Sequence, residues 1–500
     1  MNQKRSRIIF SIYFLLVIPG LYFLAEDNIG YFIDRRLSKQ DIQVESTGAD
    51  FDLLSRSVAF DKITFSSDQY GSISFVDLKV RKINLLSMLP AFGFKAESVS
   101  MDSLLIALEQ ESIEADTSKQ MFQLSGKHFG VDRLDIAYGQ FDYTGEDNST
   151  QFVFKLEALR GDMGEGVSQG LLTLHDLQHR SLEAATLVTL DSLWVDLDLG
   201  QLLANGIHYK SSLDQAAFVD QFPHQRDWVD LALPSLKMNG MDLSEWEANG
   251  FQCERVSLDS AEIKIYKDKT LTESEKSDMK LLIDQLKEIP LLIHLDTVTV
   301  IQASVSYREK HGVDRMGNLH FDRLYASIYN LNTTPDMPVI MDAQASFQEA
   351  GRLNAHFEFQ PSPGQTKVNG TLSAMDMKKV NEMTISSFGV KVKSGWLSDL
   401  DFDFQYDEHQ SKGLLHMHYD DLALQFVDHS NETRNLNQNL SSFLANAFVI
   451  KKKNQPGQIN YKEGPIAFVR DKSKLDIGYW WRSLQTGIMA SVRMNKPQAA

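Results

Sequence analysis

The sequence predicts a mainly β protein: a long twisted antiparallel sheet curled into an elongated groove, with few short helices and one N-terminal transmembrane helix. Three observations support this prediction, namely a strand pattern that recurs along the chain, little helical periodicity, and one apolar segment near the N-terminus. With 43% hydrophobic and 23% charged residues, the 500-residue chain is globular in composition. A net charge of −17 argues against binding to nucleic acid phosphates.

The apolar segment spans Ile8–Leu24, 17 residues without a charge. As a helix it would be about 25 Å long, the short end of a membrane span. Lys4, Arg5 and Arg7 precede it, which places the N-terminus in the cytoplasm. A cleaved signal peptide is the alternative, but bulky Phe23 would then stand at the −3 position of the cleavage site, so we favour an uncleaved anchor. Either interpretation exports residues 25–500.

One spacing of apolar residues recurs: two alternating positions, a two-residue step, then three more alternating positions. Asp-Ser fills the step in three copies, and a partial copy runs through Val58, Phe60, Ile63 and Phe65. The five full copies are Val99, Met101, Leu104, Ile106 and Leu108; Leu134, Ile136, Gly139, Phe141 and Tyr143; Val188, Leu190, Leu193, Val195 and Leu197; Val256, Leu258, Ala261, Ile263 and Ile265; and Val298, Val300, Ala303, Val305 and Tyr307.

Alternation places one set of side chains on one face of a sheet. The extra residue of the step would turn all later side chains to the other face. A β-bulge absorbs that residue and restores the apolar face, so each copy predicts a bulged, twisted strand. A tight turn at the step is the competing interpretation. One apolar and one polar face are typical of an antiparallel sheet.

Three helices are predicted in the rest of the chain. Thr272 and Glu275 form a capping box before an apolar stripe that ends at Pro290. A second helix is expected over residues 440–447. The last covers residues 477–492, with Ile477, Trp481, Leu484 and Ile488 on one side.

Motifs that carry chemistry are scarce. Gly166-Val-Ser-Gln-Gly170 matches the nucleophile-elbow pattern, but its context favours a glycine-rich turn. His416 and His418 share one strand face but lack a third metal ligand. The acidic alternation at 399–403 is expected to be a polar strand face rather than a calcium site, and the lysines at 451–453 a solvated turn rather than a contact for acidic lipids. Cys253, the single cysteine, is expected to be a small buried residue, which excludes internal disulfides. We predict no enzymatic activity, no cofactor and no metal.

The anchor and the repeated strands resemble the AsmA-like superfamily, which includes TamB-like proteins. The resemblance is clearest at Ile289–Leu331, with I-H-L-D-T-V-T-V and then H-F-D-R-L-Y-A-S-I-Y, and at S-G-W-L-S-D-L-D-F-D-F in Ser394–Phe404. The tail, N-A-F-V-I-K-K-K-N at 446–454 and Y-W-W-R-S-L-Q-T-G-I at 479–488, is similar to that of Bacteroidetes members. The resemblance implies a repeating β-groove, an anchor in the bacterial inner membrane with residues 25–500 in the periplasm, and a role in lipid transport or outer-membrane biogenesis.

This interpretation divides the chain into a cytoplasmic N-terminus (1–7), an anchor (8–24), an N-terminal part of the groove (25–310), a C-terminal AsmA-like part (311–430) and a helical tail (431–500). The groove would bind a phospholipid or another envelope lipid. The alternative is an assembly scaffold for outer-membrane proteins, with its apolar faces packed internally. The residues expected to face lipid are Val99, Met101, Leu104, Ile106, Leu134, Ile136, Phe141, Leu193, Val195, Leu197, Ile263, Ile265, Val298, Val300 and Val305.

The final helix has two possible roles. Tyr479, Trp480, Trp481 and Leu484 would contact a membrane interface, as aromatic residues beside Arg482 often do. Alternatively, the helix covers the open end of the sheet. The sequence does not separate these two roles.

Overall fold

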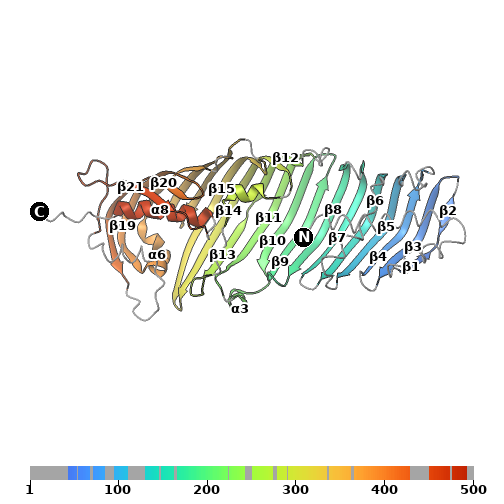
Figure 1. Cartoon of the computed structure of the whole chain (residues 1–500), viewed down its shortest axis with the longest axis horizontal. Coiled ribbons are helices and arrows are strands. Elements are labelled where there is room, and N and C mark those ends of the chain that lie inside the picture. The colour runs from blue at the N-terminus through green and yellow to red at the C-terminus, as the bar shows by residue number, and fades with distance from the viewer. Residues whose placement is uncertain are drawn as a thin grey trace. The chain divides into compact units, whose positions relative to one another are not determined.

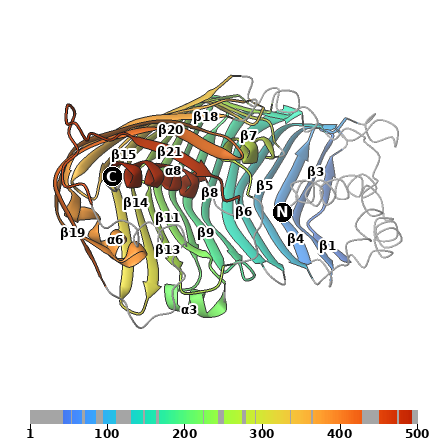
Figure 2. The same ribbon diagram turned by 60° about the vertical axis from the view of Figure 1, so that its left-hand side comes forward.

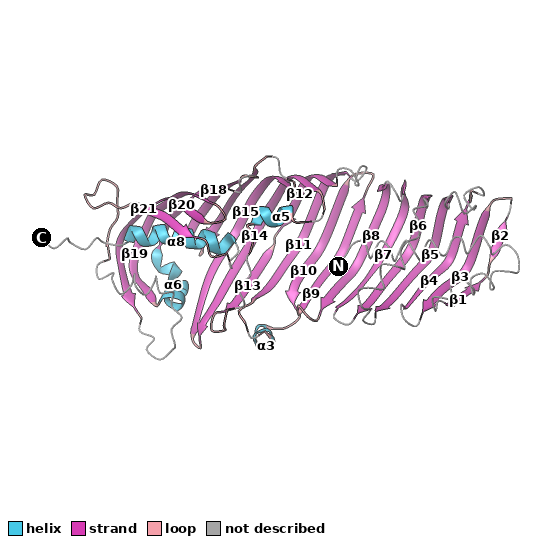
Figure 3. Ribbon diagram, in the orientation of Figure 1, coloured by secondary structure: helices cyan, strands magenta, loops and turns pink. Residues whose placement is uncertain are grey.

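The computed structural model describes residues 43–52, 54–67, 71–84, 95–110, 130–145, 148–162, 166–222, 224–242, 250–273, 279–289, 291–334, 337–361, 365–427, 450–472 and 476–492. Strands account for most of them (Figure 3), which confirms the mainly β prediction. The chain divides into two compact units, Met1–His208 with Lys237–Gln252, and Tyr209–Leu236 with Cys253–Ala500.

The predicted anchor at 8–24 and the predicted helix at 440–447 lie outside the described residues. Among the helices that the structure does describe, none has both the length and the apolar character that a membrane span requires.

The first unit is built from strands that follow one another across the sheet (Figure 1). At its first edge two short strands, β1 and β2, both pair with β3. Short edge strands limit pairing with other chains. The strands are β1 (Gln43–Thr47), β2 (Asp50–Asp52), β3 (Ser57–Ser67), β4 (Gly71–Arg81), β5 (Lys95–Gln110), β6 (Gly130–Gly145), β7 (Asn148–Asp162), β8 (Gly166–Ser181), β9 (Thr186–Asp196) and β10 (Gln201–Ser211).

The expectation of a purely antiparallel sheet is wrong at β5 and β6, which pair in parallel. These strands carry the first two copies of the recurrent pattern, and the pairing aligns them position by position. Val99 lies opposite Leu134, and Ile106 lies opposite Phe141. A parallel pair requires a crossover connection of about a dozen or more residues, and residues 111–129 separate these two strands.

The two-residue steps coincide with irregularities in the strands. The pairing of β6 with β7 shifts between Ile136 and Gly139, inside the step of the second copy. In β9 the two-residue step lies within a continuous strand. It lies opposite Asp176 of β8, whose φ of +55° shows that the backbone of β8 is distorted at the same place. Leu193 nevertheless pairs with Leu174 on one side of that distortion, and Leu190 pairs with Leu177 on the other side. These observations confirm the predicted bulges.

Ala158 in β7 adopts a left-handed φ of +50°, and a side chain of the neighbouring strand supports it. The Asp135 carboxylate of β6 accepts a hydrogen bond from the Ala158 amide at 2.8 Å and from the Arg133 guanidinium at 2.7 Å. A bulge leaves a backbone amide without its ladder partner, and Asp135 supplies the missing acceptor.

We therefore expect Asp135→Ala to lower the free energy of unfolding by about 1–3 kcal/mol, because the Ala158 amide loses its acceptor. Urea unfolding followed by circular dichroism measures the change. Asp102→Ala, at the exposed step of β5, is the matched control and should change stability by less than about 0.5 kcal/mol. Equal effects of the two substitutions would contradict the supporting role of Asp135.

The core of the first unit lies on the apolar faces of β3–β6. Phe60, Ile63, Val99 and Ile136 are each only 1% exposed. Phe154 and Leu156 of β7 pack against this core but are only partly buried. Burial therefore decreases between β6 and β7.

In the second unit β13 pairs with β11 and β14, β12 pairs with β14, and the strands from β14 to β21 pair in chain order, while the helix α8 lies along β20 and β21 (Figure 2). Its β13 and β14 form a second parallel pair, again an exception to the antiparallel prediction, and the chain between them includes the helix α5. The residues of β11 from Lys237 onward and the first two residues of β12 belong to the first unit, and the last three residues of β10 belong to the second. The strands are β11 (Asp227–Asp242), β12 (Phe251–Asp259), β13 (Glu262–Asp268), β14 (Ile293–Gly312), β15 (Arg315–Asn332), β16 (Val339–Phe347), β17 (Gly351–Phe359), β18 (Thr366–Asp376), β19 (Val390–Tyr406), β20 (Gln410–Phe426) and β21 (Gly464–Val469); the helices are α3 (Gln215–Gln221), α5 (Leu282–Lys287), η5 (Met377–Val380), α6 (Asn381–Phe388) and α8 (Asp476–Val492).

The two copies of the recurrent pattern in this unit differ in backbone conformation at the two-residue step. The fifth copy runs through β14, whose pairing with β15 shifts between Val300 and Ala303, with Gln302 at a φ of +54°. The fourth copy breaks at Ser260, with a φ of +57°, into the separate strands β12 and β13. Both β12 and β13 pair with β14, so the chain continues in one direction across the break and the competing tight turn does not form there.

The predicted capping box at Thr272 is wrong. Thr272 forms a parallel β-bridge with His224, and its hydroxyl lies 2.9 Å from His224 Nδ1. The helix α5 begins only at Leu282, after Leu281, which makes no side-chain cap. Thr272 therefore contacts a segment that is distant in the sequence and does not cap a helix.

The helix α8 confirms the predicted helix over 477–492, but only part of the expected stripe docks, because Leu484 and Ile488 pack against the core whereas Ile477 and Trp481 are exposed. Ser483, Gly487 and Ser491 lie on the buried face, and Ser483 Oγ is 2.7 Å from Ser411 Oγ of β20. A Cβ atom on Gly464 of β21 would lie 2.2 Å from the Gly487 carbonyl oxygen. Small residues thus permit a close helix–sheet approach, whereas Ile477 stays 69% exposed.

The segment 450–462 is fixed to β20 by two buried polar side chains. Asn454 is fully buried; its backbone pairs with Tyr419, and its side chain donates to the carbonyls of Met417 and Lys462. Lys451 is 2% exposed and donates to Asn454 Oδ1 at 2.5 Å. Burial lowers the pKa of Lys451. The predicted solvated turn is therefore wrong at Lys451.

Asn454→Ala should destabilise the second unit by about 2–4 kcal/mol, because several buried hydrogen bonds lose a partner together. Thermal unfolding followed by circular dichroism measures this loss. Lys452→Ala, two residues earlier and exposed, provides the control and should be nearly silent. A silent Asn454→Ala would show that the segment does not depend on this residue.

Candidate functional site

The predicted lipid-facing residues fall into two classes, and the first class is buried in protein. Val99, Met101, Leu104 and Ile106 of β5 and Leu134 and Ile136 of β6 all belong to the core of the first unit, and Phe141 packs against it. Their side chains already have protein neighbours on the apolar face.

The second class in the first unit lies on β8 and β9 and is only partly buried. Leu193 pairs with Leu174, and Val195 pairs with Leu172. All four side chains are half-buried, as is Leu197, which follows the end of β9. Directly paired residues lie on the same side of a sheet, so these positions form continuous apolar rows. The rows leave part of their apolar surface without protein cover.

The second unit carries similar rows across β11, β13, β14 and β15. Val298 is buried, whereas Ile263, Ile265, Val300 and Val305 are half-buried. The pairing places them in two rows of half-buried side chains that cross all four strands. The first row is Leu231, Ile263, Val305 and Phe321, and the second is Val229, Ile265, Tyr307 and Leu319.

A charged row follows these two apolar rows on the same face. Lys267 pairs in register with Asp227 on one side and with Glu309 on the other. The Lys267 ammonium lies 2.9 Å from the Asp227 carboxylate. Glu309 accepts from the Tyr307 hydroxyl at 2.5 Å and lies 2.7 Å from His311 Nε2. Charged side chains therefore follow directly after the two apolar rows on this face of the sheet.

Glu309 remains ionised although it is largely enclosed. Burial by itself raises the pKa of this carboxyl, but hydrogen bonds from His311 and Tyr307 and the charge of Lys269 outweigh it and lower the pKa to about 2. The alternation Val305-x-Tyr307-x-Glu309 places a charged residue after two others on one face of β14, but it does not show that Asp227 and Lys267 lie beside it.

The proposed membrane-interface residues of α8 do not share one environment. Tyr479 is 2% exposed, and Trp480 packs on Phe357 of β17 with ring centroids 4.6 Å apart. Leu484 packs partly against the core, whereas Trp481 is 39% exposed. Contact between α8 and the sheet therefore occupies Tyr479 and Trp480, as the covering role predicts.

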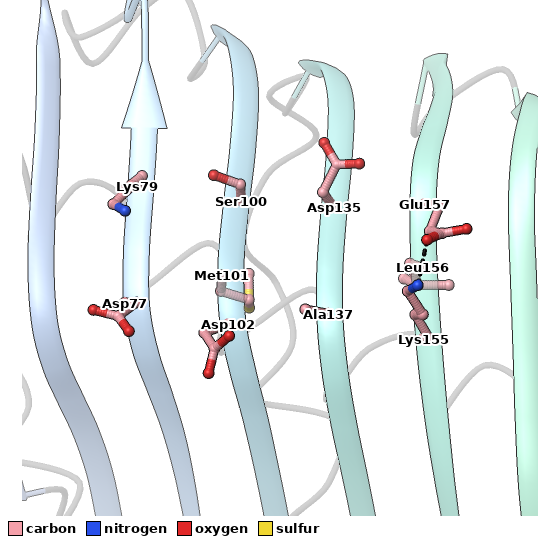
Figure 4. Close-up of a pocket in the computed structure, with 10 residues that line it drawn as sticks. All are labelled: Asp77, Lys79, Ser100, Met101, Asp102, Asp135, Ala137, Lys155, Leu156 and Glu157. Atoms are coloured by element: carbon pink, nitrogen blue, oxygen red, sulfur yellow. Dashed lines mark ion pairs between the residues drawn. The ribbon is translucent and has the colours of Figure 1, made fainter.

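A shallow pocket lies on the first unit where β4–β7 run side by side, close to the bulges (Figure 4). Asp77 and Lys79 come from β4, Asp102 from β5, and Lys155 and Glu157 from β7. Lys155 and Glu157 form an ion pair with each other. Acids and bases are mixed and mostly solvated here, so the arrangement favours no particular ligand.

Three histidine–aspartate pairs line one face of the strands β16–β20. His356 Nδ1 lies 2.7 Å from Asp342, His418 Nδ1 lies 2.7 Å from Asp399, and His416 Nδ1 lies 2.9 Å from Asp401. The described residues contain no group of three or more histidine, cysteine or acidic side chains able to hold a metal ion. His416 and His418 are therefore partners of acids across the strand pair.

The hydrogen bond from His416 to Asp401, with the negative charges of Asp401 and Glu463, raises the pKa of His416. The stability that this pair adds is complete below the unfolded pKa of about 6.5 and is lost as the pH rises through the higher folded value. His416→Asn should therefore destabilise the protein at pH 5.5 by up to about 1 kcal/mol and much less at pH 8.5.

Urea unfolding at the two pH values tests this expectation. Asp401→Asn should remove the same pH dependence, and the double variant should add no further loss. A larger effect of His416→Asn at pH 8.5 than at pH 5.5 would contradict the assigned sign.

Two further sequence motifs have structural roles. The Gly166–Gly170 motif opens the strand β8, so the predicted glycine-rich turn is wrong and no strand–turn–helix elbow exists there. Cys253 is buried, as predicted. Comparison of the chain with models of known protein families and with curated proteins found no match.

Proposed function

We propose that the protein binds and transfers envelope lipids along the half-buried apolar rows of its sheets. In this proposal the chain is held in a bacterial inner membrane by residues 8–24, with residues 25–500 in the periplasm, and it serves outer-membrane biogenesis. Sheets curled into a groove would enclose the acyl chains.

The partial burial of the rows supports the proposal. Each pair joins side chains such as Val195 and Leu172, whose apolar surface is left partly in contact with water. Covering apolar surface is favourable by about 25 cal/mol per Å², so a hydrocarbon chain laid along several rows gains free energy at each. A row that continues from strand to strand suits an extended chain better than a compact ligand.

A second candidate function is that of an assembly scaffold for outer-membrane proteins. The observation that favours it is the complete burial of residues such as Val99 and Leu104, since a packed face offers nothing to lipid. The lipid-transfer function requires the half-buried rows to be open to hydrocarbon chains, whereas the scaffold function requires them to be packed against protein.

The double substitution Val195→Lys with Leu197→Lys distinguishes the lipid-transfer function from the scaffold function. In a lipid-filled groove the lysine ammonium groups can reach water at the open side, so the protein should fold with normal circular dichroism. Mass spectrometry of the purified full-length protein should then find several-fold less bound lipid than in wild type. In a packed core the two lysines would cost several kcal/mol each and the protein would unfold.

Two further double substitutions place two lysines at other positions and serve as controls. Val99→Lys with Ile106→Lys enters the closed core and should unfold the protein. Gln151→Lys with Thr189→Lys lies outside the apolar rows and should leave folding and lipid content unchanged. The carboxylates of Asp196 and Asp198 accept hydrogen bonds from the amides of Leu199 and Gly170, so substitutions there would disturb the backbone. If the Val195 pair unfolds and wild type carries no lipid, the scaffold function stands instead.

A further inference from the structure

We infer that the charged row formed by Asp227, Lys267 and Glu309 is a site for a zwitterionic lipid head group, one that carries both a phosphate and an amine. This inference rests on the proposed function, because the head group would be that of the lipid whose acyl chains cover the apolar rows.

The first support is the order of the rows. Along β13 the side chains on one face are Ile263, Ile265 and then Lys267, so two apolar positions are followed by one charged position. Neighbouring strands repeat this order: Leu231 and Val229 precede Asp227 in β11, and Val305 and Tyr307 precede Glu309 in β14. An amphiphile has the same division between tail and head.

The second support is the sign of the charges. The row alternates acid, base, acid across the strands β11, β13 and β14. A phosphate would be stabilised by Lys267, and an amine by Asp227 and Glu309. A head group with one negative charge alone would meet the acids without compensation.

The third support is the environment of the charges. The Lys267 side chain is 19% exposed and the Glu309 side chain 16%, and Asp227 at the end of the row is 38% exposed; Lys264 and Glu262 on the other face of β13 are each about half exposed. Partly desolvated charges interact more strongly with a ligand than solvated charges do. The row therefore differs from an ordinary ion pair at the surface.

The experiment offers the full-length purified protein an equimolar mixture of phosphatidylethanolamine, phosphatidylglycerol and diacylglycerol with identical acyl chains. Mass spectrometry then measures the lipids retained. Wild type should retain about tenfold more phosphatidylethanolamine than either competitor, a ratio that corresponds to 1.4 kcal/mol.

Two substitutions in the charged row should each remove this preference, whereas a control substitution should keep it. Asp227→Asn should reduce retention of phosphatidylethanolamine to that of phosphatidylglycerol, because the amine loses an acceptor. Lys267→Gln should likewise reduce retention of phosphatidylethanolamine to that of diacylglycerol, because the phosphate loses a base. Lys264→Gln, which breaks the exposed pair with Glu262 on the opposite face, is the matched control and should keep the tenfold preference. Circular dichroism and the melting temperature of each variant verify the fold.

Three outcomes are distinguishable. Total lipid that is retained equally for all three heads, or a preference that survives both Asp227→Asn and Lys267→Gln, overturns the head-group site and leaves the groove intact. A preference for phosphatidylglycerol assigns the row to an anionic head and also overturns the inference. Retention of no lipid by wild type overturns both this inference and the proposed function.

Discussion

The bulge at the two-residue step is the constraint on which the rest of the structure depends. Without it, every apolar side chain after the step would turn to the opposite face, and a strand such as β9 would present half of its leucines and valines to water. Left-handed residues such as Ala158 and Gln302 absorb the extra residue. Because neighbouring strands place their irregularities side by side, the apolar rows continue across each sheet.

The cost of a bulge is a backbone group that leaves the ladder, and the chain compensates with local polar side chains. Asp135 accepts from the Ala158 amide, and the Gly170 amide in β8 donates to Asp198. Asp135 and Asp198 thus help to hold the strand geometry at these two positions.

Whether part of an apolar face is buried or half-buried depends on the elements that pack against it. In the first unit the side chains of β3–β6 form a buried core, and those of β8 and β9 stay half-buried. In the second unit α8 contributes Tyr479 and Trp480 to a core with β17, β19 and β20. The rows of β11, β13, β14 and β15 that end at Lys267 remain half-buried. The proposed lipid-binding surface is therefore confined to particular strands.

The sequence by itself determined the strand class, the recurrent pattern, the bulges and the final helix, because each depends on side-chain periodicity within one segment. The structure alone decided the parallel pairing of β5 with β6 and of β13 with β14, since alternation is the same in both directions. It also decided how α8 docks: hydrophobic periodicity selects Ile477 and Trp481 together with Leu484 and Ile488, but the close approach of Gly464 and Gly487 selects the small residues. Thr272, Lys451 and the row at Lys267 depend on partners far away in the sequence, and a local pattern carries no information about such partners.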